Sequence, residues 1–163
     1  MRIFLIGMPG SGKTTIARHL AEALNYTYID LDGWIERDAL MYVEEIFDRY
    51  GEEKFRALET KGLQDLPDDN IVVATGGGIV IKKENKALMN GITFFLDTDL
   101  HVIRKRLETD YHRPLLKTKS LETLFDERYL KYQDFATAVV NNNYDIDQTV
   151  KVILNYLKNE EYR

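Results

Sequence analysis

The 163-residue chain contains no cysteine, which excludes disulfides and zinc sites with cysteine ligands. Its three histidines, His19, His101 and His112, lack the spacing of metal ligands. No stretch reaches the ~18 consecutive apolar residues typical of a membrane span, and the N-terminal apolar run is too short for a signal peptide. We therefore expect a cytoplasmic protein without a membrane segment.

An excess of basic residues is also lacking. The formal net charge is −5, with 22 Lys and Arg against 27 Asp and Glu, which argues against a general nucleic-acid binder. The hydrophobic fraction of 44% and the charged fraction of 30% are typical of a globular protein with a solvated surface. We expect residues 1–163 to form a single domain and the protein to be a monomer.

The stretch Gly7-Met-Pro-Gly-Ser-Gly-Lys-Thr14 matches G-x-x-x-x-G-K-[ST], the phosphate-binding P-loop. It follows Ile3–Ile6, an apolar run of the length of a buried strand, and precedes Thr14–Leu24, whose apolar residues recur at helical spacing. The glycines therefore lie between a strand and a helix N-terminus. A glycine-rich turn without a ligand is the alternative.

The chemistry of a P-loop follows from this geometry. Glycines let the backbone curl so that its N–H groups point at phosphate oxygens, and the helix N-terminus adds positive partial charge. Lys13 brings a full charge to the β- and γ-phosphates, and the Thr14 hydroxyl can bind Mg²⁺. The predicted ATP contacts in this loop are Gly10, Ser11, Gly12, Lys13, Thr14 and Thr15.

Strand-like and helix-like segments alternate along the rest of the chain. Further strands are predicted at 26–30, 71–75, 92–96 and 138–140, and helices at 34–40, 43–50, 52–66, 83–90, 99–108, 121–135 and 147–158. This alternation predicts an α/β fold, a P-loop NTPase-type three-layer sandwich with a five-stranded parallel sheet and helices on both faces. Ligands of such sheets bind beyond the carboxyl ends of the strands.

Two carboxylates lie at one of these strand ends. Asp30 and Asp32 end the second predicted strand, where residues two apart point the same way. Both could therefore face the phosphates, one holding Mg²⁺ and the other accepting or orienting the proton of an acceptor hydroxyl. Capping of the following helix by Asp32 is an equally good interpretation.

Two other features have a structural and a functional interpretation. Arg56 and Glu59 lie on one helix face, either as a weak surface ion pair or as an arginine that binds a carboxylate while Glu59 orients it. Gly76-Gly-Gly78 is either a tight turn or a backbone that approaches a ligand closely. A third feature, the basic and non-periodic stretch 109–120, is either a solvated loop or a lid over ATP, with Arg106 or Arg113 neutralising transition-state charge.

Taken together, these motifs resemble the shikimate kinase family. The matching stretches follow the order of that family and are Gly7–Thr15, Ile29–Glu36, Ile46–Phe47, Gly51–Glu59, Ala74–Val80, Arg113–Leu116 and Glu127–Tyr132. One departure is Arg128-Tyr-Leu-Lys-Tyr132, which lacks the proline common in the family. No adenine contact is assigned in Asn141–Asp145.

The resemblance implies ATP-dependent phosphorylation of the 3-hydroxyl of shikimate, in aromatic amino-acid biosynthesis. The helical segment of about 33–62 would bind the acceptor. The implied contacts and roles are Asp32 at the ring hydroxyls and as base, Arg56 and Arg128 at the carboxylate, Gly76, Gly77 and Gly78 at the ring, Asp30 with Thr14 at Mg²⁺, Arg113 at the phosphates and Arg106 near adenine.

Two other functions remain open on the sequence alone. Another P-loop kinase of small molecules, such as a gluconate kinase, also phosphorylates a polyhydroxy acid. A nucleotide-dependent switch or binding module is the alternative of another class, although the only Asn-Lys pair, in Asn85-Lys-Ala-Leu88, lacks the aspartate of the guanine-reading motif.

Overall fold

The computed structural model describes residues 1–108 and 120–161. Its strands are β1 (Arg2–Ile6), β2 (Thr27–Asp30), β3 (Ile71–Ala74), β4 (Ile92–Asp97) and β5 (Ala138–Asn141). Its helices are α1 (Lys13–Leu24), α2 (Leu31–Ala39), α3 (Val43–Gln64), α4 (Asn85–Leu88), α5 (Leu100–Leu107), α6 (Leu121–Phe135) and α7 (Ile146–Glu161).

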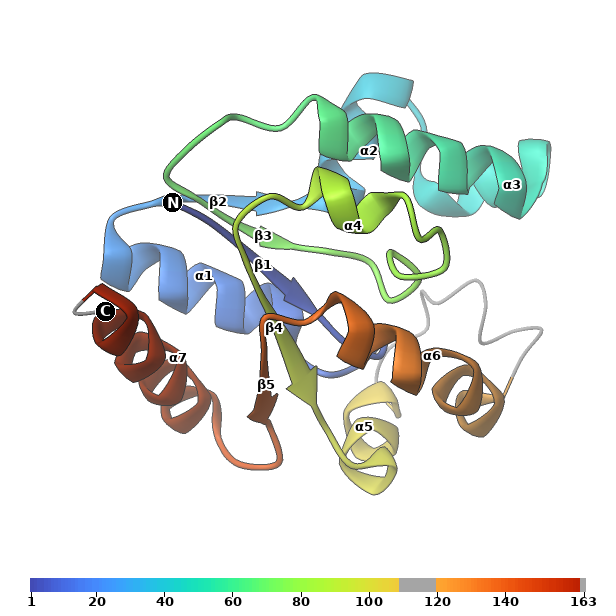
Figure 1. Ribbon diagram of the computed structural model, residues 1–163. Coiled ribbons are helices and arrows are strands. Elements are labelled where there is room, and N and C mark those ends of the chain that lie inside the picture. The colour runs from blue at the N-terminus through green and yellow to red at the C-terminus, as the bar shows by residue number, and fades with distance from the viewer. Residues whose placement is uncertain (109–119, 162–163) are drawn as a thin grey trace.

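The described residues form one five-stranded sheet in the order β2-β3-β1-β4-β5 (Figure 1). Every neighbouring pair is parallel, so the carboxyl ends of all five strands lie at the same edge. The P-loop follows β1 at this edge, Asp30 ends β2, and the glycine segment follows β3. The predicted α/β fold with a five-stranded parallel sheet is therefore confirmed.

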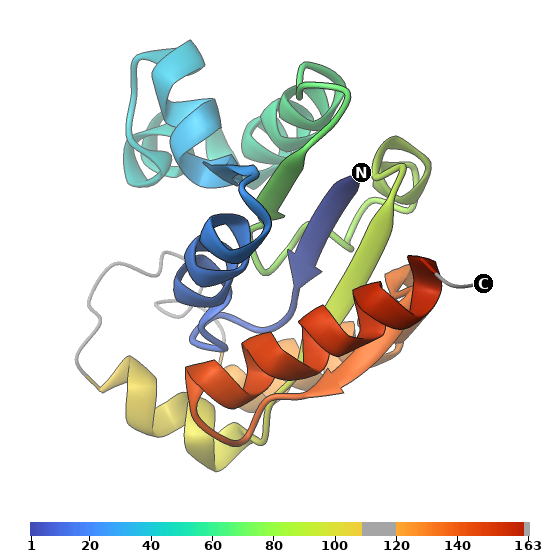
Figure 2. The ribbon, with the colours of Figure 1, turned by 90° about the vertical axis from the view of Figure 1, so that its left-hand side faces the viewer.

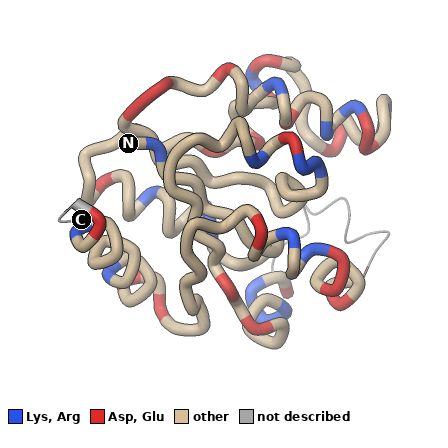
Figure 3. The backbone as a smooth tube through the Cα atoms, in the orientation of Figure 1, with Lys and Arg blue, Asp and Glu red and all other residues tan. Residues whose placement is uncertain are grey.

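Helices cover both faces of the sheet (Figure 2). Because side chains alternate along a strand, Ile3 and Leu5 of β1 pack in the cluster beneath α1 and α7, whereas Phe4 and Ile6 pack in the cluster that α2, α3, α5 and α6 cover. All four side chains are fully buried. This double burial explains why the strands read as continuous apolar runs. Lys, Arg, Asp and Glu are interspersed along the helices rather than gathered by sign (Figure 3).

Two residues interrupt or end helices through their backbone conformation. Asn25 ends α1 in the left-handed conformation, with φ of 57°. Gly51, which separates the predicted helices 43–50 and 52–66, is a non-helical residue with φ of 83° and ψ of 175° inside α3. The two predicted helices on either side of Gly51 are therefore the two halves of one interrupted element. A new first helical turn therefore begins after Gly51. Arg56 lies in this second half of α3.

Some boundaries differ from the prediction. The helix expected from Trp34 begins at Leu31, directly after β2, because no loop separates the two elements. The helix expected over 83–90 is reduced to the single turn of α4. The predicted lid of 109–120 lies outside the described residues, except for Ser120, which caps α6 by accepting a hydrogen bond from the Thr123 N–H.

Candidate active site

A cleft of about 340 Å³ lies at the carboxyl edge of the sheet. The P-loop, the β2–α2 junction, the glycine segment after β3 and the end of α5 form its walls. Most of the residues predicted to bind the nucleotide, the metal or the acceptor line it, namely Gly10, Gly12, Lys13, Thr14, Thr15, Asp30, Asp32, Gly76, Gly77 and Arg106. The edge of the sheet therefore brings together segments that are far apart in sequence.

The P-loop has the backbone geometry that its glycines predict. Gly10 and Gly12 have φ of 83° and 88°, values that side chains rarely allow. The Lys13 ammonium donates to the carbonyls of Gly7 at 2.7 Å and Met8 at 2.9 Å, so its side chain lies along the loop. Arg106 Nη1 donates to the Ser11 carbonyl at 2.8 Å, so the loop contacts α5 through the residue predicted near adenine.

Asn142, to which the sequence analysis assigned no role, supports the same loop. Its amide nitrogen donates to the Ser11 carbonyl at 2.5 Å and to Thr98 Oγ1 at 3.1 Å, and its amide oxygen accepts from the Thr149 hydroxyl at 2.8 Å. Asn142 is buried, as are Thr98 and Thr149. In the sequence it is one of three consecutive asparagines, and nothing local distinguishes it from the others.

The two aspartates differ in their placement. Asp30 ends β2 and is the residue before α2, whereas Asp32 lies in the first turn of that helix. The expectation that both end a strand is therefore wrong for Asp32. Capping by Asp32 is also wrong, because Asp32 lies inside the helix and the cap position belongs to Asp30. Both residues nevertheless line the cleft.

Asp32 is the strongly perturbed carboxyl group of the cleft. Burial, together with the nearby charges of Asp30 and Glu59, raises its pKa from 3.8 to about 7, and Lys13 opposes the shift. Its Oδ1 is buried and has no hydrogen-bond partner among the described residues. A buried acceptor of this kind, with a pKa near neutrality, suits a group that receives a proton from a bound hydroxyl.

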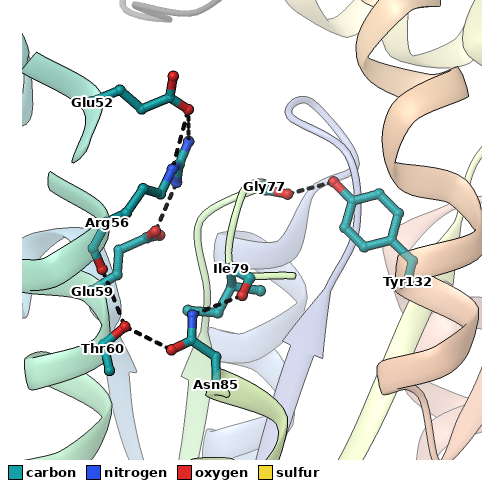
Figure 4. A network of polar contacts seen from close by, with 8 residues as sticks. All are labelled: Glu52, Arg56, Glu59, Thr60, Gly77, Ile79, Asn85 and Tyr132. Carbon is teal, nitrogen blue, oxygen red and sulfur yellow. Dashed lines mark hydrogen bonds and ion pairs between the residues drawn. The ribbon is translucent and has the colours of Figure 1, made fainter. Parts of the chain in front are cut away.

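Arg56 and Glu59 form a buried ion pair, not a surface one (Figure 4). Their side chains are 6% and 0% exposed, and Arg56 Nη1 donates to Glu59 Oε1 at 2.7 Å. The other carboxylate oxygen, Oε2, is buried without a hydrogen-bond partner in residues 1–108 and 120–161. Burial raises the pKa of Glu59, and the charge of Arg56 opposes this shift. The alternative of a weak surface pair is therefore wrong.

The three glycines after β3 make room for side chains of the site. A methyl group at Gly76 would lie 3.2 Å from Asp32 Oδ1 and 3.2 Å from Glu59 Oε2. At Gly78 it would overlap the guanidinium group of Arg56. The segment does turn, with the Ile79 N–H donating to the Gly76 carbonyl, but none of the three glycines has a positive φ, so close approach is what requires glycine here.

Helix α6 holds the other side of the glycine segment. Arg128 is buried, and its Nε has no hydrogen-bond partner within the described part of the chain. A methyl group at Gly77 would lie 3.2 Å from Arg128 Nη1. One helical turn on, the Tyr132 hydroxyl donates to the Gly77 carbonyl at 2.6 Å (Figure 4). Tyr132 also stacks on Phe95 of β4, with ring centroids 5.0 Å apart, and burial raises its pKa to about 12.

A second residue that sequence reasoning missed ties α3 to this segment. The buried Asn85 of α4 donates from Nδ2 to the Ile79 carbonyl at 2.9 Å and accepts at Oδ1 from the Thr60 hydroxyl at 2.8 Å (Figure 4). The predicted site residue Arg113 lies outside the described residues. Ser11 is a buried residue of the P-loop that does not line the cleft, and every other predicted site residue lines the cleft or lies beside its glycine segment.

The described residues contain no cluster of three or more His, Cys, Asp or Glu that could hold a metal ion. Mg²⁺ does not require one, since proteins usually hold it through one or two side chains together with phosphates and water. Thr14 and Asp30 line the same cleft, so the donors present fit Mg²⁺ bound in this manner.

The parallel sheet, the P-loop with its lysine, and a carboxylate with a raised pKa beside it define a P-loop nucleotide-binding protein equipped for phosphoryl transfer. A family model described as shikimate kinase matches residues 9–158. The shikimate kinase of Synechococcus elongatus is 44% identical over 136 residues, which are 80% of this chain and 72% of that protein. The shikimate kinase of Macrococcus caseolyticus is 37% identical over 166 residues, 99% of both chains. The chain belongs to the shikimate kinase family.

A solved structure described as shikimate kinase from Acinetobacter baumannii in complex with shikimate has the same fold. It matches this chain with a TM-score of 0.90 and 34% identity, over 97% of this chain and 93% of that one. The resemblance inferred from the scattered motifs is therefore confirmed along nearly the whole chain.

Proposed function

We propose that this protein transfers the γ-phosphoryl group of ATP to the 3-hydroxyl of shikimate. The observation that carries the proposal is the pair of buried arginines, Arg56 and Arg128, which lie on either side of the glycine segment beside the P-loop cleft. Arg56 is already paired with Glu59, so an acceptor carboxylate would supply counter-charge for the second buried cation, Arg128, and would bind both arginines at once. The relative from Acinetobacter baumannii has been solved with shikimate.

In the proposed reaction, the acceptor hydroxyl oxygen bonds to the γ-phosphorus as the bond to the β–γ bridging oxygen breaks, and ADP leaves. Lys13 and the N–H groups of the P-loop bind the phosphates, and Arg106 contacts the nucleotide. Mg²⁺, when bound, neutralises charge on the phosphates, and we assign Thr14 and Asp30 as its protein ligands. Arg113 would act on the phosphates from the predicted lid.

Asp32 would receive the proton of the 3-hydroxyl. Its buried Oδ1 supports this role because the atom accepts no hydrogen bond from another group of the described structure. A pKa of about 7 leaves a substantial carboxylate fraction at neutral pH and a favourable affinity for the proton. Gly76 lets the backbone pass close to this oxygen, which supports a role for Gly76–Gly78 at the acceptor ring.

The described residues include no helix that is long and apolar enough to cross a bilayer. We propose that the protein acts in the cytoplasm as a monomer. A nucleotide-dependent switch would share the P-loop but would not require buried arginines next to the glycine segment. Gluconate is also an acid, so one arginine would fit a gluconate kinase as well, and it is the two arginines together with the triple glycine that favour shikimate.

A coupled ADP-release assay tests the proposal. Shikimate, gluconate, nucleoside monophosphates and a reaction without acceptor are compared at saturating ATP and Mg²⁺. We expect turnover with shikimate only; equal turnover without acceptor would indicate a switch, and turnover with gluconate alone would indicate the other kinase.

Arg56 provides a second, residue-specific test. Its loss removes charge-assisted hydrogen bonds worth about 1.5–3 kcal/mol, or roughly ten- to over a hundredfold in kcat/KM for shikimate. Arg56→Lys should recover only part of this, because an ammonium lacks the planar fork. Methyl shikimate, whose carboxylate is blocked, should be equally poor with the wild type and the variant. Equal losses for the acid and the ester would show that Arg56 does not bind the carboxylate.

A further inference from the structure

The guanidinium group of Arg56 is engaged on two edges. A guanidinium has five N–H donors, which form two edges that can hold a carboxylate with two parallel bonds, Nε with Nη2 and Nη1 with Nη2. Glu52 Oε1 accepts from Nε at 3.3 Å and from Nη2 at 3.2 Å. Glu59 Oε1 accepts from Nη1 at 2.7 Å. Each edge therefore carries a carboxylate of the protein itself.

The two carboxylates differ in how easily they can leave. Glu59 is fully buried and close to Nη1, whereas the Glu52 side chain is 44% exposed and reaches both nitrogens with one oxygen at long distances. Glu52 lies one residue after the break at Gly51, in the first turn of the second half of α3, where a freed side chain can turn to solvent. Only the contact of Glu52 is weak enough for a ligand to replace.

Neither face of Arg56 offers an equivalent alternative. A methyl group built at Gly78 would lie at nearly equal distances from Cζ, Nη1 and Nη2, so the Gly78 backbone covers one face of the guanidinium plane. Phe55 lies on the same helix, with its ring centroid 5.3 Å from Arg56 Cζ. All N–H donors of a guanidinium group lie in its plane, so an acceptor carboxylate must bind an edge, and the Nε–Nη2 edge is the one that an exposed group holds.

We propose that Glu52 is a tethered competitor of the acceptor, a carboxylate that holds the Nε–Nη2 edge of Arg56 until the carboxylate of shikimate displaces it. This inference rests on the proposed function. Glu52 then sets the acceptor affinity of the enzyme without touching the acceptor. It also keeps a buried cation paired, because Glu59 and Glu52 together supply its counter-charge.

The expected size of the effect follows from the strength of such a pair. A Glu and an Arg four residues apart on a helix favour the paired state by about twofold. The edge is then available in roughly a third of the molecules, so removing the competitor should strengthen acceptor binding about threefold. The acceptor gains nothing from this change if it has no carboxylate.

The test compares Glu52→Ala with Glu53→Ala in the full-length protein. Glu53 is exposed and adjacent in sequence, so the control variant removes the same charge from the same helical turn. Titration calorimetry measures the Kd of shikimate, of methyl shikimate and of ATP for each protein. We expect a Kd for shikimate about threefold lower in Glu52→Ala only, with the Kd values of methyl shikimate and ATP unchanged.

Three results would overturn the proposal. An unchanged or higher Kd for shikimate in Glu52→Ala would make Glu52 a bystander or a group that positions Arg56. Equal tightening in Glu53→Ala would attribute the effect to net charge, and equal tightening of methyl shikimate would exclude competition for the carboxylate edge. Failure of the proposed function is distinct, since the wild type would then neither bind nor phosphorylate shikimate.

Discussion

Replacing Asp32 by asparagine tests the chemistry of the cleft most directly. The substitution is isosteric and keeps the first turn of α2, but it removes both the charge and the proton acceptor. If Asp32 receives the proton of the acceptor hydroxyl, kcat should fall by ~10²-fold or more, the usual contribution of a positioned base. Phosphoryl transfer also depends on positioning and electrostatics, so a smaller fall would make Asp32 an orienting group.

The raised pKa of Asp32 also predicts how activity changes with pH. The carboxyl group is largely protonated below its pKa of about 7 and cannot then accept a proton. The kcat of the wild type should therefore rise with pH between about 6 and 8, and the residual kcat of Asp32→Asn should lack this rise. A coupled assay with the second enzyme in excess at every pH measures both profiles.

The same pKa predicts a gain in stability for the variant, with a definite sign. Because the folded pKa of about 7 exceeds the unfolded value near 3.8, the folded protein binds more protons between these limits, and its stability falls as the pH rises through them. The penalty is complete above the folded pKa and absent below the unfolded one. Asparagine does not titrate, so Asp32→Asn should be more stable than the wild type, and more so at pH 8 than at pH 5.

Urea unfolding at pH 5 and pH 8 measures this difference in the absence of ligands. The reasoning would be refuted by a wild type whose kcat is flat from pH 6 to 8, together with a variant whose relative stability does not change with pH. Loss of stability in the variant at pH 8 would instead mean that the Asp32 carboxylate makes a favourable contact in the folded protein.

Three further substitutions probe separate parts of the site. Lys13→Ala should abolish turnover while the far-UV circular dichroism spectrum is kept, because the Lys13 ammonium lines the cleft and donates to the loop carbonyls of Gly7 and Met8 rather than packing in the apolar core; near-normal turnover would remove the P-loop from the mechanism. Gly78→Ala should raise the KM of shikimate at least tenfold and leave that of ATP within about twofold, since the new methyl group displaces Arg56. Tyr132→Phe should lower the free energy of unfolding by about 0.5–1.5 kcal/mol in urea titrations, because the partly buried Gly77 carbonyl loses its donor; an unchanged midpoint would contradict this.

The sequence was sufficient to predict those structural features whose determining contacts are local. The P-loop register is set within eight consecutive residues, Gly7–Thr14, and the Arg56–Glu59 pair by helical spacing. The strands could be recognised because burial on both faces makes them apolar throughout. The break between the predicted helices 43–50 and 52–66 falls at Gly51, whose φ of 83° is a conformation that glycine favours.

Prediction from the sequence did not extend to contacts that only the tertiary structure creates. Asn142 is 131 positions from the Ser11 carbonyl to which it donates, and Tyr132 is 55 positions from Gly77. Nothing in the sequence around Asn142 or Tyr132 indicates that its side chain donates to a distant backbone carbonyl. The start of α2 was misplaced for a local reason. Gly33, a poor helix former, lies in the first turn of α2, so the helical sequence pattern could be recognised only from Trp34 onward. The burial of Arg56 and Glu59 was equally hidden, since charged residues at helical spacing most often face solvent.

The triple glycine shows how a composition that is unfavourable locally can be required by the site. Each glycine admits a different neighbour. Gly76 passes beside the carboxylates of α2 and α3, Gly77 lies against Pro9 and Arg128, and Gly78 covers the guanidinium group of Arg56. One glycine could relieve one of these approaches but not all three, because they come from different elements at successive residues. The entropic penalty of ordering three glycines is therefore the condition for bringing the P-loop, the proposed base Asp32 and the two arginines close to one another.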